Sequence, residues 1–251
     1  MRNLKVVTLL VISLSGFTMT AQAANLEILS LGANASQLPT SFNPSHLADI
    51  NNFAQAGGDS VIVGAGSQIS VFTVANKTTA NGLAVTNVTN GNDKLRFTYF
   101  GKEAGFENLA IVFDGGFATL FSASNKPDNG SISAEFTLNQ LGLSNGGMVP
   151  FLLRRLTGGV LDANNSGLIA GNLSIGFSQL FTNSDGVTNG SVLALFDDGG
   201  GSQDRDFDDF VLGIGVIPAA IPLPASMLFL LTGLFCFGIV SKKRGQFFPA
   251  I

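Results

Sequence analysis

Short apolar runs separated by Asn-Gly and Asp-Gly dipeptides repeat along most of this chain, and they constrain its fold more than any other feature. The dipeptides supply the positive φ angles that tight turns between strands require. The runs between them are rich in β-branched and aromatic residues, as expected of strands. The pattern predicts an all-β fold, specifically an antiparallel β-sandwich of the jelly-roll type. The expected strands are 61–66, 68–74, 82–88, 94–100, 109–113, 117–121, 131–138, 149–156, 167–177, 191–196 and 210–216.

One short helix is expected before these strands, within residues 38–56. Asn43 can cap its N-terminus and Pro44 can occupy the first helical position. Apolar residues then recur about one helical turn apart from Leu47 to Phe53. Half of the 22 phenylalanines of the chain lie within the expected strands, which indicates that these residues pack the core and do not line a ligand site.

The N-terminal segment has the features of a secretory signal peptide. Two basic residues precede an apolar core from Val6 to Phe17, and Ala21-Gln22-Ala23 forms a small-x-small cleavage site. A membrane helix that is kept is the alternative, but it would need roughly 20 apolar residues, and this core is shorter. We therefore expect residues 1–23 to be removed on export, so that the mature chain begins at Ala24.

The C-terminal segment contains a second apolar stretch. Residues 225–240 carry no charge and are followed by the basic cluster Lys242, Lys243 and Arg244. With a few preceding residues, such a helix is just long enough to cross a bilayer, and the basic cluster would hold its end in the cytoplasm. This arrangement predicts a transmembrane helix with the domain outside the cytoplasm.

The residues of this tail carry a resemblance. Pro222, Leu223, Pro224 and Ala225, an apolar helix and a terminal basic cluster together resemble a PEP-CTERM sorting signal of the Val-Pro-Leu-Pro-Ala type. The resemblance implies that an exosortase, a membrane protease-transpeptidase of Gram-negative bacteria, recognises residues 218–251 and cleaves near the proline motif. It also implies association with exopolysaccharide and biofilm. The alternative is an ordinary membrane anchor.

The part of the chain between the two terminal segments is expected to form one exported domain, residues 24–217. Segments 95–108 and 193–214 resemble stretches of ectodomains of uncharacterised function that carry the same sorting tail. The chain has 13 basic and 17 acidic residues, and the terminal segments hold five of the basic ones, so this domain has 8 against 17 and a formal charge of −9. Such a charge disfavours nucleic acid as a partner. Because the one cysteine, Cys236, lies in the tail, no disulfide can form within the domain.

Six aspartates near the end of the domain form a group that we call the acidic turn. In a glycine-rich loop these carboxylates repel one another, and Ca²⁺, which takes six to eight oxygen ligands, is a suitable counterion. The alternative is a solvated turn whose aspartates cap backbone N–H groups. If a strand already begins here, Asp206 and Asp208 face one side and Asp209 the other, which limits convergence. The six residues are Asp197, Asp198, Asp204, Asp206, Asp208 and Asp209.

A second stretch, residues 162–168, begins like a calcium loop, with Asp162, Asn164 and Ser166 at alternate positions. The bidentate acid expected at the twelfth position is missing, because that residue is Leu173. We therefore favour an Asx-turn here over a metal site.

The sequence contains few of the residue combinations that are typical of active sites. The chain has a single histidine, His46, no serine in a nucleophile-elbow motif, four glutamates and no tryptophan. We therefore expect a non-enzymatic protein of the cell envelope or matrix, tethered to the inner membrane as a precursor and later released to the cell surface. A calcium-dependent carbohydrate-binding module that binds exopolysaccharide or other surface glycans is the alternative, and a secreted hydrolase is a weaker one.

Overall fold

The domain between the two terminal segments is built of antiparallel β-sheets, as the turn pattern predicts. Each expected strand that falls within the described residues contains an observed strand, and the all-β prediction is confirmed. The expected helix and the expected strand 61–66 lie outside these residues. The computed structural model describes residues 23–29, 34–37, 68–102, 105–122, 131–132, 135–178, 192–199, 206–219 and 232.

Four short strands were not among those expected from the sequence. β1 and β2 precede the first expected strand, and β10 and β12 fall in stretches interpreted as connections. The strands are β1 (Asn25–Leu29), β2 (Asn34–Gln37), β3 (Gln68–Thr73), β4 (Gly82–Thr86), β5 (Lys94–Gly101), β6 (Asn108–Phe113), β7 (Phe117–Ser122), β8 (Ser131–Ile132), β9 (Phe136–Thr137), β10 (Gly147–Met148), β11 (Phe151–Arg155), β12 (Leu161–Asn164), β13 (Ser174–Ser178), β14 (Val192–Asp197) and β15 (Phe210–Ile217).

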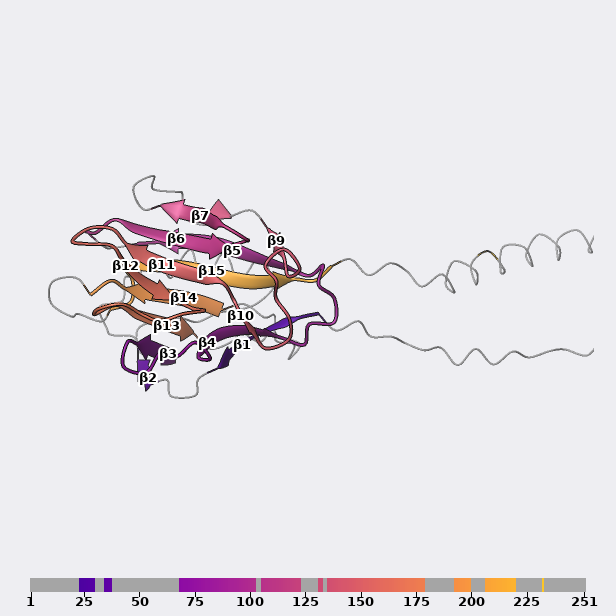
Figure 1. The fold of residues 1–251 in the computed structure, drawn as a ribbon, viewed down its shortest axis with the longest axis horizontal. Helices are drawn as coiled ribbons and strands as arrows, with labels where there is room; N and C mark the ends of the chain where they lie inside the picture. The colour runs from indigo at the N-terminus through magenta and orange to yellow at the C-terminus, as the bar shows by residue number, and fades with distance from the viewer. Residues whose placement is uncertain are drawn as a thin grey trace, which may run out of the picture.

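These strands form three antiparallel sheets (Figure 1). The largest has the order β2-β3-β13-β14-β15-β5-β8, with β9 also paired to β5. A second sheet has the order β12-β11-β6-β7, and a third has the order β1-β4-β10. Neighbours such as β15 and β5 are far apart in sequence, so the large sheet is assembled mainly from long-range pairs.

The sheets face one another across a shared hydrophobic core, which gives the domain a sandwich-like architecture. Phe72 and Phe177 of the large sheet are fully buried, and Phe151 of the second sheet meets Phe177 edge to face with ring centroids 6.3 Å apart. Burial of such a ring contributes roughly 1.5–3 kcal/mol to folding. Leu83 and Val85 of the third sheet belong to the same core. The phenylalanines among the described residues thus mostly serve packing, as the sequence indicates.

The alternation predicted for β5 is present. Leu95, Phe97 and Tyr99 point into the shared core, and burial raises the pKa of the Tyr99 phenol to about 12. The opposite face of this strand is covered as well, since Phe100 is 1% exposed and lies against Gly213 of β15. A Cβ at Gly213 would lie 2.5 Å from the Phe100 ring, so the close approach requires glycine there.

Asn165 joins the second and third sheets. This side chain is fully buried just after β12, and its amide accepts a hydrogen bond from Leu83 N (2.8 Å) and donates to Leu83 O and Val149 O (both 2.8 Å). All three partners are backbone groups. Leu83 O and Val149 O also accept from Val149 N and Phe151 N, both at 2.9 Å, so Asn165 adds a second bond to each of these carbonyls. Asn165 therefore fixes β4 relative to the chain entering β11.

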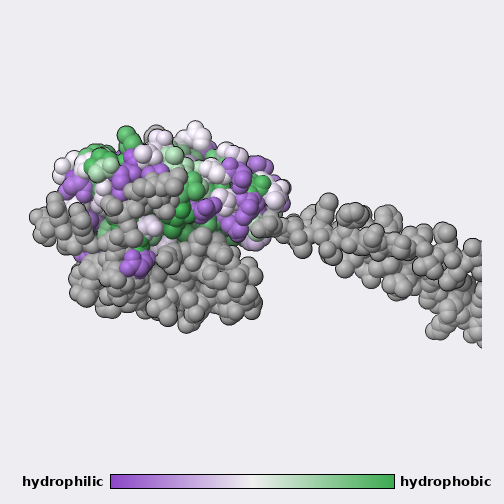
Figure 2. Space-filling view, turned by 90° about the horizontal axis from the view of Figure 1, so that it is seen from below, coloured by the Kyte–Doolittle hydropathy of each residue, from purple (hydrophilic) through white to green (hydrophobic). Residues whose placement is uncertain are grey.

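The described surface is mixed in character. Figure 2 shows hydrophilic and hydrophobic residues interspersed over the described part of one face. Large apolar side chains that are exposed, Val74, Val160 and Leu168, lie outside the strands. Among the described residues, no helix is both long and apolar enough to cross a membrane.

Candidate functional site

The acidic turn lies where β14 ends and β15 begins. These strands are antiparallel partners with Phe196 opposite Phe210, so the residues after β14 and those before β15 meet at one end of the sheet. Asp197 and Asp198 leave β14 there, and residues 206–209 lead into β15. Hairpin pairing therefore brings the described members of the acidic turn together.

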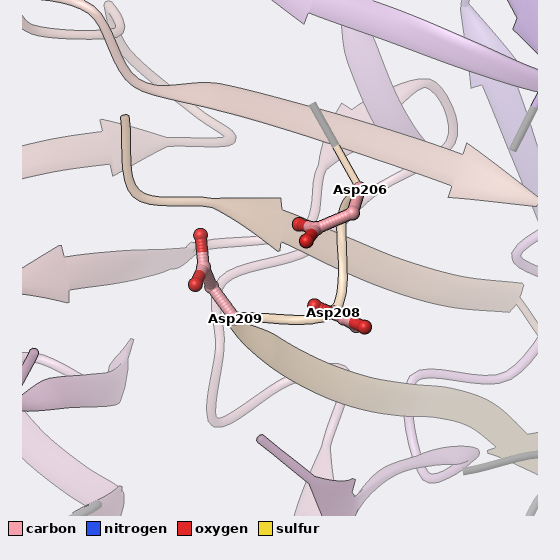
Figure 3. A group of neighbouring side chains, drawn as sticks. All are labelled: Asp206, Asp208 and Asp209. Atoms are coloured by element: carbon pink, nitrogen blue, oxygen red, sulfur yellow. The ribbon is translucent and has the colours of Figure 1, made fainter. Parts of the chain in front are cut away.

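The three aspartates before β15 converge more closely than a strand would allow. Carboxylate oxygens of Asp206, Asp208 and Asp209 all lie within 4.8 Å of one another (Figure 3). They converge because β15 begins only at Phe210 and the preceding residues form a bend. Phe207, in the middle of this bend, has a φ of 60°, a left-handed conformation that is uncommon for a residue with a bulky side chain.

Burial of the Phe207 ring accounts for this conformation. The side chain is 2% exposed and covers Gly176 of β13, where a Cβ would lie 3.3 Å from the ring. A left-handed residue of this kind costs on the order of 1–3 kcal/mol, and burial of the ring offsets a similar amount. The buried ring thus holds the backbone in a bend that places the carboxylates of Asp206 and Asp208 close to each other.

Hydrogen bonds across the hairpin order the carboxylates. Asp209 Oδ2 accepts from the backbone N–H of Asp198 at 2.8 Å, and Asp197 Oδ1 accepts from Gly199 N at 2.9 Å. The predicted capping role of such aspartates is therefore present at these two positions. Asp198 Oδ2 accepts from Asn108 Nδ2 at 3.0 Å.

Two residues of the second sheet, Asn108 and Arg155, support the acidic turn. They are cross-strand partners on β6 and β11. Asn108 is fully buried, and Arg155 Nη1 donates to the carbonyl of Asp198 at 2.6 Å while its guanidinium lies 5.4 Å from the Phe106 ring centroid. Neither was identified from the sequence, because they lie 90 and 43 residues from Asp198 and no local motif links them.

The electrostatics of the acidic turn are unfavourable for full ionisation. Burial, together with the negative charges of Asp198, Asp206 and Asp197, raises the pKa of the Asp209 carboxyl to about 8, although the hydrogen bond from Asp198 N opposes the shift. At neutral pH this carboxyl therefore holds a proton unless a cation compensates the cluster. A cation bound by Asp206, Asp208 and Asp209 would displace that proton.

This arrangement provides part of a hard-cation site. Three carboxylates within 4.8 Å of one another supply oxygen ligands of the kind that Ca²⁺ prefers. The three carboxylates fit a calcium ion in ligand type, and further oxygens would be needed to reach six.

The second predicted candidate, residues 162–168, is an Asx-turn. Asn164 Oδ1 accepts from Ser166 N at 2.9 Å and from Ser166 Oγ at 3.1 Å. Asp162 is held by Arg154 through two hydrogen bonds, from Nε to Oδ1 (2.7 Å) and from Nη2 to Oδ2 (2.9 Å). Both carboxylate oxygens are thus engaged by a cation of the protein itself, and the preference for an Asx-turn is confirmed.

Asp93 forms a second polar site, at the other end of β15, that the sequence analysis did not identify. Its side chain is 3% exposed. Oδ2 accepts from Ala24 N and Oδ1 accepts from Ala219 N, both at 2.8 Å. One carboxylate therefore holds the first and last parts of the described domain, and we call Asp93, Ala24 and Ala219 the terminal clamp.

The remaining predicted site residues lie outside the described part of the chain. They are Asp204, the single histidine His46, the sorting motif Pro222, Leu223, Pro224 and Ala225, and the basic cluster Lys242, Lys243 and Arg244.

Comparisons with known proteins do not assign the chain. No model of a known protein family matches it, and no curated protein is significantly similar to it in sequence.

Proposed function

We propose that this chain is an exported, non-enzymatic β-sandwich protein of the Gram-negative cell envelope or extracellular matrix, sorted by an exosortase through its C-terminal tail. The observation that supports it best is the terminal clamp. Its carboxylate binds Ala24, the expected first residue after signal-peptide removal, and Ala219, three residues before the expected sorting motif at Pro222.

The clamp is suited to a domain processed at both ends. Ala24 and Ala219 are bound to the two oxygens of one side chain, so both connections leave the domain at the same place. β15 and β1 also contact each other there. A precursor tethered to the inner membrane could then be cut at either connection while the sheets between them remain intact.

The role proposed for the domain is structural or adhesive, in an exopolysaccharide-rich matrix. The large aromatic core and the sandwich-like sheets give it stability that does not depend on disulfides, which suits an oxidising compartment. A jelly-roll connection of the strands is the finer fold that we propose for it.

Intact-mass measurement of the protein in membrane and extracellular fractions of its native host tests the sorting proposal. We expect a species that begins at Ala24 and ends near Pro222 to Ala225. A membrane-bound species that still ends at Ile251 would instead indicate an ordinary anchor. Deletion of the coding sequence, followed by measurement of matrix composition and cell cohesion, tests the matrix role, and unchanged values would contradict it.

A second candidate function, a calcium-dependent carbohydrate-binding module, is favoured by the acidic turn. Three carboxylates within 4.8 Å, one with a pKa raised to about 8, form a cluster whose charge a divalent cation would compensate. Calcium bound there would hold the β14–β15 connection in one conformation, which is how such an ion can shape a glycan-binding surface.

Thermal unfolding of the mature protein with calcium or with a chelator tests this second function. A ligand that binds only the folded state at 100 times its Kd stabilises it by about 2.7 kcal/mol, which corresponds to a rise in Tm of roughly 5–10 °C for a domain of this size. Asp206→Asn and Asp208→Asn should reduce the rise, whereas Asp114→Asn, at an exposed turn, should not. Absence of a shift at millimolar calcium would eliminate this function; a shift without calcium-dependent retention on exopolysaccharide would leave a structural ion only.

A further inference from the structure

The terminal clamp places a buried negative charge against two neutral donors. Both Ala24 N and Ala219 N are backbone amides in the full chain. The ion pairs of the described residues join Glu135 to Lys94 and Arg96, and Asp162 to Arg154, so none involves Asp93. Burial of an ionised carboxylate is costly unless a cation or strong hydrogen bonds compensate it. The site is therefore suited to a cation located where one of the two amides lies.

Removal of the signal peptide would create such a cation in place. Signal peptidase hydrolyses the Ala23–Ala24 bond with one water molecule, which leaves a carboxylate on Ala23 and a free amine on Ala24 that takes up a proton. The nitrogen of that α-ammonium is the same atom that now lies 2.8 Å from Asp93 Oδ2. An α-amino group has an ordinary pKa near 8, so it is largely protonated at neutral pH.

We propose that this cleavage completes the terminal clamp, because it converts the amide hydrogen bond from Ala24 to Asp93 into a buried ion pair that stabilises the mature domain relative to its precursor. The inference rests on the proposed export and cleavage at Ala24. The carboxylate of Asp93 already makes the bond from the Ala24 amide charge-assisted, and cleavage adds the Coulomb attraction of a second, opposite charge, which is stronger away from bulk water. Ala23 is half-buried, so its loss opens one side of the new ammonium group to water, which can satisfy its remaining donors.

The ion pair also acts on the other end of the domain. Asp93 holds Ala219 through its second oxygen, so a carboxylate fixed by the ammonium group presents that oxygen to Ala219 in one orientation. The backbone of Asp93 is itself fixed, since its N–H donates to Asn90 O and its carbonyl accepts from Leu138 N. Cleavage at the N-terminus thus stabilises the position from which the sorting tail leaves the domain.

A double-mutant cycle tests the inference. Its four proteins are expressed as full-length precursors and exported, and the mature forms are measured. Insertion of Ser-Gly between Ala23 and Ala24 keeps the cleavage site but displaces the new amine by two residues. Asp93→Asn keeps an acceptor oxygen and removes its charge. We expect the insertion to lower the Tm of the mature protein by about 4–10 °C when Asp93 is present and by less than about 2 °C in the Asp93→Asn background. Equal effects in both backgrounds, or no effect in either, would overturn the ion pair.

If Asp93→Asn does not fold, a second measurement still tests the ion pair. Acylation of the α-amine at neutral pH should be at least tenfold slower in the native mature protein than in the insertion variant, and equal rates would contradict the inference. N-terminal sequencing of the same samples separates the two proposals. An exported, sorted protein that begins elsewhere than Ala24 refutes the clamp alone, whereas a chain that is never exported refutes the proposed function.

Discussion

The two ends of β15 carry buried carboxylates in different surroundings. Next to Ile217, Asp93 uses its two oxygens to accept one backbone N–H each. Next to Phe210, five described aspartates of the acidic turn share a small volume, and the pKa of Asp209 is raised to about 8 by burial and by its neighbours. An eight-residue strand separates the two sites by roughly 25 Å.

The difference shows that burial of a carboxylate does not by itself decide whether it stabilises a fold. At the terminal clamp, one negative charge is matched with two donors, so its removal should leave those donors unsatisfied. In the acidic turn, each added negative charge opposes the ionisation of the others, so removal of one should relieve repulsion. Substitution at the two ends of β15 should therefore change the free energy of unfolding in opposite directions at high pH.

The largest expected effect is at the terminal clamp. Asp93→Ala removes the acceptor from both Ala24 N and Ala219 N, and hydrogen bonds to charged groups contribute about 1.5–3 kcal/mol each. We expect the free energy of unfolding to fall by about 3–5 kcal/mol, measured by urea denaturation of the mature protein. Asp114→Ala, at an exposed turn, is the matched control and should change it by less than about 0.5 kcal/mol. A loss at Asp93 no greater than at Asp114 would remove the basis of the comparison.

Asn165 tests whether the contrast depends on charge or on hydrogen bonding alone. This fully buried amide makes three hydrogen bonds to Leu83 and Val149 and carries no charge. Asn165→Ala removes three buried hydrogen bonds and takes the side-chain acceptor away from Leu83 N, so we expect a loss of about 2–4 kcal/mol in the free energy of unfolding. Asn164→Ala, in the neighbouring Asx-turn, should cost about 1 kcal/mol or less. Equal losses at the two positions would show that the buried bonds are not what joins these sheets.

The acidic turn should give an effect of the opposite sign that depends on pH. Asp209 has a pKa of about 8 when folded and near 4 when unfolded, so between these values the folded state holds a proton that the unfolded state releases. Stability from this group is therefore present below pH 4 and is lost as pH rises to about 8. Asp209→Asn keeps an oxygen that can accept from Asp198 N, and we expect it to flatten this decline.

Denaturation at pH 5, 7 and 9 in the presence of chelator measures this prediction. We expect Asp209→Asn to be more stable than the unmodified protein at pH 9 and closer to it at pH 5. Calcium should stabilise the unmodified protein more at pH 9 than at pH 5, because the ion and the proton compete for the same oxygen. A parallel decline in both proteins would show that Asp209 does not titrate as described.

The sequence predicted the strands well because their signals are local. Alternation such as that of Leu95, Phe97 and Tyr99, bounded by turn dipeptides, needs no tertiary information. β2 was missed because Asn34–Gln37 has no apolar alternation, and its pairing with β3 is a tertiary contact. β12 was missed because Asp162 and Asn164 are residues that favour turns. Asn164 does begin a turn, but it is also the last residue of the strand.

The sites were predictable only where the chain itself brings residues together. The acidic turn follows from the hairpin of β14 and β15, but its convergence depends on the left-handed Phe207, which the sequence does not indicate. In the terminal clamp, Asp93 binds Ala24, which lies 69 positions earlier in the chain, and Ala219, which lies 126 positions later. A single aspartate after an Asn-Gly turn gives no sequence signal of these contacts. Arg155 and Asn108 were missed for the same reason, because they contact Asp198 from distant positions in the sequence.

The smallest expected effect is at the half-buried pair between Arg154 and Asp162, which has good geometry without deep burial. Two hydrogen bonds of 2.7 and 2.9 Å join these side chains, yet 25% and 34% of their surfaces remain exposed. Solvent screens such a pair, so Asp162→Asn should lower the free energy of unfolding by about 0.5–1 kcal/mol, and less in 1 M salt. A double-mutant cycle with Arg154→Gln isolates the pairwise term. A coupling as large as that expected between Asp93 and the Ala24 ammonium group would mean that pairing geometry, and not burial, distinguishes the carboxylates of this fold.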